Sequence, residues 1–180
     1  MTLSAPTRIP TKTNKLVIIG LGLIGGSLAA AYKARATALD NPLEVVGVVR
    51  RRATAEYALD NNIVDRVVLS LAEIADELVA GDIIFIAVPT LSVVDSLIEI
   101  KALVDSAVTI TDGASVKGNI LTAVKAIYGE YPQQFVPGHP IAGSEKSGVT
   151  AADANLYVNH RVILTPVDET GNGHYQAIKN

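Results

Sequence analysis

The chain has 180 residues, of which 49% are hydrophobic and 18% charged, and its formal net charge is −3. This composition excludes a disordered chain, and the basic run Arg50–Arg52 is too short to form a nucleic-acid surface. Cysteine is absent, which excludes disulfides and thiolate metal sites, and we expect no metal site.

No segment has the length or pattern of a targeting or membrane element. Residues 1–13 are polar, contain two prolines and lack the apolar stretch of a signal peptide. We expect them to form a flexible segment. The longest apolar run, Ile83–Val88, is far too short to cross a bilayer. We therefore expect a soluble, cytoplasmic protein with no membrane or nucleic-acid partner.

Short apolar runs alternate with longer amphipathic or alanine-rich runs. The short runs predict strands at Lys15–Ile19, Val45–Val49, Val67–Val68, Ile83–Val88, Val108–Thr111, Phe135–Val136 and Val162–Leu164. The longer runs predict helices at Ile24–Leu39, Ala53–Asn61, Leu71–Val79, Val93–Val104 and Lys117–Tyr128. Strands without polar alternation are buried on both faces. The pattern therefore predicts a doubly wound α/β fold with a mostly parallel sheet, which binds ligands at the carboxyl ends of its strands.

A glycine-rich turn with G-x-G-x-x-G spacing joins the first predicted strand to the first predicted helix. Gly20 permits the tight turn, Gly22 lets a pyrophosphate approach the backbone, and Gly25 lets the helix pack closely on the strand. The helix start, with Leu23 and Ile24, then presents free amide groups to the anion. We predict a Rossmann-type NAD(P) site here, and a turn without a ligand is the alternative.

The end of the second predicted strand bears on the choice of cofactor. NAD-binding domains commonly place an acidic residue there to bind the ribose 2′-hydroxyl. Here the strand runs into Arg50, Arg51 and Arg52, whereas Glu44 lies at its opposite end. Arginine suits a 2′-phosphate by charge and by bidentate hydrogen bonding. We predict NADP as the first choice, although arginines that merely begin a solvated helix would leave NAD open.

Two later strand ends carry further candidate residues. Val88 and Pro89 end the long strand before residue 90, a place that lies beside the nicotinamide in many such folds, although Pro89 could simply terminate the strand. Ser115 follows the next strand and could cap the helix after it while pointing its hydroxyl at a ligand. Asp112 and Ser115 could equally be ordinary turn and cap residues.

A histidine lies between glycine and proline where another strand is predicted to end. His139 in this setting could accept a proton from a substrate hydroxyl as hydride leaves the same carbon, since imidazole has a suitable pKa near 6.5. A lone histidine is more often structural. His160 and His174 have no such setting, and we expect both to lie on the surface.

Several of these segments, taken together and in order, resemble the prephenate/arogenate dehydrogenase family of tyrosine biosynthesis. They are Gly20–Leu28, Ser115–Lys117, His139–Gly148 and Ile163–Pro166, and the third is the most diagnostic. The resemblance implies a dinucleotide-binding domain over residues 14–168. It also implies that residues 169–180 begin the connection to a helical C-terminal domain, absent from this chain, which builds a homodimer and completes the active-site cleft.

The resemblance further implies NAD(P)-dependent oxidative decarboxylation of prephenate or arogenate. His139 would be the base at the ring hydroxyl, Ser115 would bind that hydroxyl and orient His139, and Glu145 would lie near the substrate side chain. The family usually has glycine directly before this serine, whereas here Ala114 precedes Ser115. The alternatives are a β-hydroxyacid-type dehydrogenase and a non-catalytic NADP-binding regulatory module. We expect this chain alone to be poorly active.

Overall fold

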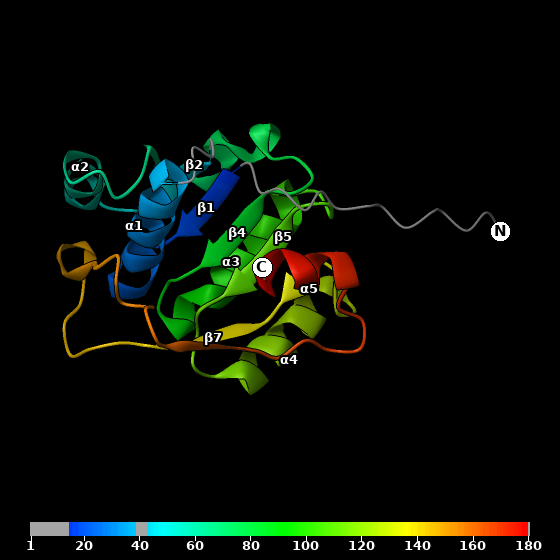
Figure 1. The fold of residues 1–180 in the computed structure, drawn as a ribbon. Helices are drawn as coiled ribbons and strands as arrows, with labels where there is room; N and C mark the ends of the chain where they lie inside the picture. Colours follow the sequence, from blue (N-terminus) through cyan, green and yellow to red (C-terminus); the bar gives the residue numbers. More distant parts are fainter. Residues whose placement is uncertain (1–14, 39–42, 180) are drawn as a thin grey trace.

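Six parallel strands form a single sheet in the computed structural model, which describes residues 15–38 and 43–179 (Figure 1). In chain order they are β1 (Lys15–Ile19), β2 (Glu44–Val48), β3 (Arg66–Val68), β4 (Ile83–Ile86), β5 (Thr109–Asp112) and β6 (Phe135–Val136). The order across the sheet is β3-β2-β1-β4-β5-β6, and all neighbours are parallel. The direction of winding reverses between β1 and β4, where such folds open a crevice for ligands. The predicted fold class is confirmed.

Helices cover both faces of this sheet. They are α1 (Leu23–Ala38), α2 (Arg52–Asp60), α3 (Thr90–Leu103), α4 (Lys117–Tyr128) and α5 (Asn172–Lys179), with the 3₁₀ helices η1 (Leu71–Glu73), η2 (Ala75–Glu77) and η3 (Val149–Ala151). One buried cluster joins the sheet to α3, α4 and η1, and the other joins it to α1, α2 and η3. Val17 and Ile19 of β1 belong to the first cluster, and Leu16 and Ile18 to the second. This alternation buries both faces of β1, as its unbroken apolar run predicts. The predicted flexible segment 1–13 lies outside the described residues.

The segment between β3 and β4 differs from its predicted form. The helix predicted over Leu71–Val79 is instead two single-turn 3₁₀ helices, η1 and η2, which meet at Ile74. The Ser70 hydroxyl accepts a hydrogen bond from the Ala72 amide, and the backbone becomes extended at Leu78. Ile74 and Leu78 are nevertheless buried. The apolar spacing therefore predicted the buried side correctly but not the element, because so short a connection takes the tighter i→i+3 bonding.

Two strands lie outside the main sheet. β7 (Gly138–Ile141) and β8 (Arg161–Leu164) form an antiparallel ribbon in which His139 lies opposite Ile163. The predicted strand at Val162–Leu164 is therefore confirmed as a strand, but its burial is not. Val162 is 51% exposed and Ile163 is 47% exposed. Among the residues that the structure describes, this two-stranded ribbon leaves apolar side chains open to solvent, which the apolar run alone does not reveal.

The C-terminal helix α5 packs against β5 and β6 (Figure 1). His174 on this helix is only 6% exposed, and its Nδ1 lies 2.8 Å from the Thr109 hydroxyl oxygen in β5. The prediction that His174 lies on the surface was wrong, because α5 folds back onto the sheet. Burial lowers the pKa of His174 to about 4. His160 is exposed, as predicted.

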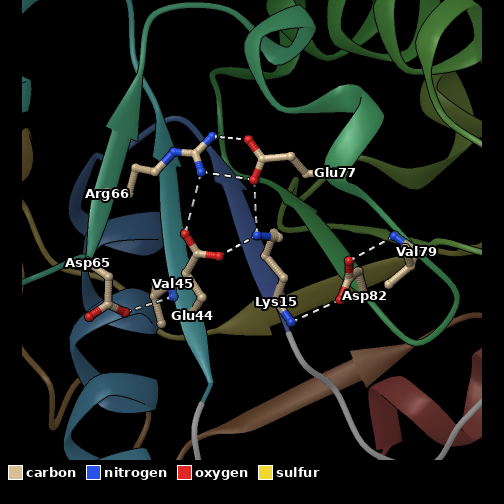
Figure 2. A network of polar contacts seen from close by, with 8 residues as sticks. All are labelled: Lys15, Glu44, Val45, Asp65, Arg66, Glu77, Val79 and Asp82. Carbon is tan, nitrogen blue, oxygen red and sulfur yellow. Dashed lines mark hydrogen bonds and ion pairs between the residues drawn. The ribbon is translucent and has the colours of Figure 1, made fainter.

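A network of charged side chains ties together the amino ends of the strands (Figure 2). Lys15 begins β1, Glu44 begins β2 and Arg66 begins β3. Lys15 donates to Glu44, and Arg66 donates to both carboxylate oxygens of Glu77 in η2, at 2.9 and 2.5 Å. The Asp82 carboxylate accepts the Lys15 backbone amide at 2.9 Å. Glu44 is therefore paired with Lys15 at the amino ends of the strands. Ligands bind in this fold at the opposite, carboxyl ends of the strands.

Candidate cofactor and catalytic site

A cavity of about 410 Å³ opens at the carboxyl ends of β1, β2 and β4. Its walls come from residues 19–22 after β1, residues 48–51 after β2 and residues 87–89 after β4, with further residues from α3. The volume falls within the roughly 300–1,000 Å³ typical of small-molecule sites. The cavity therefore lies at the switch point that the fold class predicts.

Two of the three glycines of the turn have geometric reasons to be glycine, and the third borders open space. Gly20 has φ +97°, and a Cβ on it would lie 2.9 Å from Cγ1 of Val88. A Cβ on Gly25 would lie 2.1 Å from the Gly20 carbonyl oxygen and 2.9 Å from a methyl carbon of Ile18. A Cβ on Gly22 would meet nothing within 4 Å. Gly20 therefore makes the turn, Gly25 lets α1 approach β1, and Gly22 keeps a backbone surface open beside the cavity.

The start of α1 lies at this turn. α1 begins at Leu23, and the amides of its first residues have no acceptor within the helix. Gly20, Leu21 and Gly22 line the cavity, whereas Leu23 and Ile24 do not. The Ile24 carbonyl instead accepts a hydrogen bond from the Tyr157 hydroxyl at 2.8 Å. Leu23 and Ile24 can therefore bind a ligand only through their backbone amides, which lie at the positive end of the helix.

Arginines flank the β2 side of the cavity. Arg50 and Arg51 line it, and Arg52, the first residue of α2, does not. All three side chains are exposed, and none forms a hydrogen bond or ion pair with another described residue. Two acidic residues of α3, Asp95 and Glu99, also line the cavity, and Glu99 accepts the amide of residue 71 at 3.3 Å. The structure therefore brings two of the three predicted arginines to the cavity.

Val88 and Pro89 line the same cavity, and Pro89 lies at the N-cap of α3. The wall that α3 supplies to the cavity through Ser92, Ser96 and Glu99 was not predicted from the sequence. These residues recur at the i, i+4 and i+7 spacing that places side chains on one helix face. A polar stripe at the start of a helix after the fourth strand was a signal that could have found them.

Ser115 lies in the loop after β5 and is exposed. It does not cap α4, because α4 begins at Lys117, its N-cap residue is Val116, and no side chain forms a capping hydrogen bond. The expectation of a Ser115 cap was therefore wrong: the loop is one residue longer than a cap at Ser115 requires. Its hydroxyl consequently remains available to a ligand.

His139 is the second residue of β7 and is half-buried. Glu145 is exposed in the loop that leaves β7, and the end of this loop, Gly148 and Val149, lines the cavity. Within the part of the chain that the structure describes, no hydrogen bond joins His139 to Ser115 or Glu145. Ser115 and His139 therefore lie on neighbouring segments near the carboxyl end of β5. The loop that contains Glu145 runs from the strand of His139 to the cavity.

Comparison with known proteins identifies the family. The model described as "Prephenate dehydrogenase, nucleotide-binding domain" matches residues 34–180, well over half of the chain. The chain belongs to the prephenate dehydrogenase family. The match begins within α1, so the family assignment does not depend on the glycine-rich turn. It confirms the resemblance found in the sequence and does not favour a β-hydroxyacid-type dehydrogenase.

Named members of the prephenate dehydrogenase family agree with this assignment. The prephenate dehydrogenase of Lactococcus lactis subsp. cremoris is 37% identical over 153 residues, which are 84% of this chain and 40% of that protein. The structure of Aquifex aeolicus prephenate dehydrogenase in complex with hydroxyphenyl propionate and NAD⁺ is 28% identical, with a TM-score of 0.80 over 93% of this chain and 56% of that one. Synechocystis arogenate dehydrogenase is 29% identical, with a TM-score of 0.78 over 92% and 54%. The chain thus spans about half the length of these proteins.

Proposed function

We propose that this chain is the cofactor-binding part of an enzyme that uses NAD(P) to oxidise and decarboxylate prephenate or arogenate. The observation that carries the proposal is the position of His139. It lies on the strand that leaves the carboxyl end of the sheet, one loop away from the cavity beside the glycine-rich turn. Family membership and the names of the relatives support the same reaction.

The residues around the cavity fit a dinucleotide. Gly22 leaves open backbone for a pyrophosphate, and the amides of Leu23, Ile24 and Gly25 begin a helix whose dipole favours an anion. Val88 and Pro89 would contact the nicotinamide half. The bound oxidised nicotinamide supplies the hydride acceptor.

The protein's own contribution to the chemistry is a positioned base. In this proposal His139 accepts the proton of the substrate's ring hydroxyl. The hydrogen on the same ring carbon leaves as hydride with the electron pair of its C–H bond. The carbonyl formed there accepts, through the ring, the electron pair of the bond to the ring carboxylate as CO₂ leaves. The ring becomes aromatic, and the resulting phenolate oxygen regains the proton held by His139. Ser115 hydrogen-bonds the hydroxyl, and Glu145 lies near the substrate side chain. A base held in place contributes roughly 10²- to 10⁴-fold to such a step.

A His139→Asn substitution tests the reaction. We expect kcat for prephenate or arogenate in the complete enzyme to fall by at least about 10²-fold, because the base is lost. The dissociation constant of the dinucleotide should remain unchanged. The exposed His160 provides the matched control, and His160→Asn should leave both quantities unaltered. Normal turnover by His139→Asn would refute the catalytic role.

The preferred cofactor is NADP in this proposal. Arg50 and Arg51 line the cavity after β2, free of other ion pairs in the described part of the chain, and Glu44 is engaged at the far edge of the sheet. Replacing both Arg50 and Arg51 by Gln should weaken NADPH binding by at least about 100-fold, since charge-assisted hydrogen bonds contribute about 1.5–3 kcal/mol each and two residues that donate them are lost.

The measurement is a parallel titration of the chain with NADPH and NADH. NADH binding should be nearly unchanged in the double variant, and Arg52→Gln is the matched control because Arg52 does not line the cavity. Tighter binding of NADH than of NADPH by the unmodified chain would contradict the proposal.

We also propose that a helical C-terminal domain completes the substrate cleft and forms a homodimer in a cytoplasmic enzyme, with residues 169–180 leading into it. The roughly twofold greater length of the relatives supports this arrangement. Light scattering of the 180-residue chain and of the complete enzyme tests it, because only the latter should be dimeric.

A further inference from the structure

A buried ion pair at the end of β5 takes no direct part in the proposed proton transfer. Asp112 is the last residue of β5, and its side chain is 0% exposed. Lys117 is the first residue of α4, and its side chain is 15% exposed. The Lys117 ammonium donates a hydrogen bond to the Asp112 carboxylate. The pair therefore links the end of the sheet to the start of the following helix.

The same two side chains hold both polar backbone groups of Gly138. The Gly138 amide donates to Oδ1 of Asp112 at 3.3 Å, and the Gly138 carbonyl accepts from the Lys117 ammonium at 2.5 Å. A Cβ on Gly138 would lie 2.9 Å from the Asp112 carbonyl oxygen. β7 therefore begins in close contact with the end of β5, at a position fixed from both sides.

Fixing Gly138 restricts His139. The peptide unit between them is planar, so the held carbonyl sets the plane that contains the His139 nitrogen. Pro140 follows and confines His139 to extended backbone. Across the ribbon, His139 lies opposite Ile163. The imidazole of His139 therefore projects from a backbone that is constrained by Gly138 before it, by Pro140 after it and by the pairing with β8.

The ion pair also encloses the loop that carries Ser115. Oδ2 of Asp112 accepts the amide of Ala114 at 3.1 Å and the ammonium of Lys117. Ser115 lies between these two contacts. A single carboxylate–ammonium pair thus constrains both of the segments that carry the proposed base and the proposed hydroxyl ligand.

Local energetics alone do not favour a lysine at this position. A cation in the first turn of a helix opposes the helix dipole, and α4 has no acidic residue in its first turn to offset it. Burial lowers the pKa of Lys117, and the Asp112 carboxylate acts in the opposite direction. A buried pair is also weak as a source of stability, because desolvation offsets much of the attraction. Residues that break local rules in this way are concentrated at functional sites.

We propose that Asp112 and Lys117 are positioning residues that hold His139 and Ser115 in register for proton transfer. The inference rests on the proposed function, since it assigns a role within that reaction. Neither residue touches the reacting atoms. Both act through the backbone of Gly138 and through the loop around Ser115.

Lys117→Met tests the proposal, with Lys125→Met as the matched control. Lys125 lies on the same helix, is exposed and has its ammonium 5.5 Å from the ring centre of Tyr131. In the complete enzyme, Lys117→Met should lower kcat by about 10²-fold, as expected for a small misplacement of a base. The dissociation constant for NADPH should not change, because Lys117 does not line the cofactor cavity. Lys117→Arg, which keeps the cationic donors, should recover part of the lost kcat.

Hydrogen exchange of the β7 amides in the 180-residue chain provides a readout independent of turnover. Lys117→Met should accelerate their exchange at least about tenfold, and Lys125→Met should not. Unchanged kcat in a folded Lys117→Met enzyme, or unchanged exchange of these amides, overturns the proposal. If the unmodified enzyme oxidises neither prephenate nor arogenate, the proposed function fails, and the exchange rates still decide whether Lys117 holds β7. Should Lys117→Met fail to fold, Asp112→Asn supplies the same two readouts.

Discussion

At the scale of single residues, the G-x-G-x-x-G spacing of the turn predicts where the backbone has no room for a side chain. The positive φ of Gly20 and the close packing at Gly25 are the steric requirements that the sequence pattern predicts, and Gly22 borders open space. The three predicted arginines follow the prediction less closely than the glycines do, because only Arg50 and Arg51 line the cavity. Backbone geometry is specified by nearby residues, whereas the reach of a long side chain depends on where its helix begins.

Alanine substitutions separate the structural and ligand-facing glycines. Gly25→Ala should lower the free energy of unfolding by more than about 2 kcal/mol, because its Cβ would lie 2.1 Å from the Gly20 carbonyl oxygen. Gly22→Ala should cost less than about 1 kcal/mol but weaken dinucleotide binding at least about tenfold, because its Cβ enters open space beside the cavity. Urea unfolding and NADPH titration measure the two effects. Equal loss of stability in both variants would refute this division of roles.

At the scale of elements, the contacts of α5 and of the β7–β8 ribbon were not predictable from their own residues. α5 is short, yet it buries His174 against β5. The run from Val162 to Leu164 in the ribbon is apolar, yet Val162 and Ile163 are about half exposed. In both cases burial depends on which other element covers the segment, and periodicity within the segment carries no information about that.

The buried contact of α5 makes stability depend on pH. His174 has a pKa of about 4 in the folded protein and about 6.5 when unfolded. Between these values the unfolded state binds more protons, so the free energy of unfolding is highest above pH 6.5 and falls as the pH drops toward 4. The loss attributable to His174 should be of the order of 2–3 kcal/mol, since each pKa unit corresponds to about 1.4 kcal/mol.

Urea unfolding at a series of pH values between 7 and 4 measures this effect. The difference between the unmodified chain and His174→Gln isolates the contribution of His174 from that of the carboxylates. His160→Gln is the control, since His160 is exposed. Parallel stability curves for the unmodified chain and His174→Gln would show that His174 is not the group responsible.

At the scale of the whole molecule, the two edges of the sheet have different roles. The amino edge carries the network of Lys15, Glu44, Arg66 and Glu77, which ties the first three strands together (Figure 2). The carboxyl edge carries the cavity and, near β5, the segment of His139. The described residues include no group of three or more His, Asp or Glu side chains suited to a metal ion, and no helix long and apolar enough to cross a membrane. The cavity and the segment of His139 therefore lie toward the same end of the strands.

The sequence alone determined the alternation of strands and helices, the doubly wound fold and the glycine turn. These depend on the periodicity of apolar residues and on local steric limits, which neighbouring residues specify. Two contacts required the folded chain: Lys117 donates to the Gly138 carbonyl across 21 residues, and His174 meets Thr109 across 65. Such contacts depend on how completed elements pack, and no local pattern encodes that packing. The glycine turn could therefore be recognised from its spacing, whereas the support beneath His139 became visible only in the folded chain.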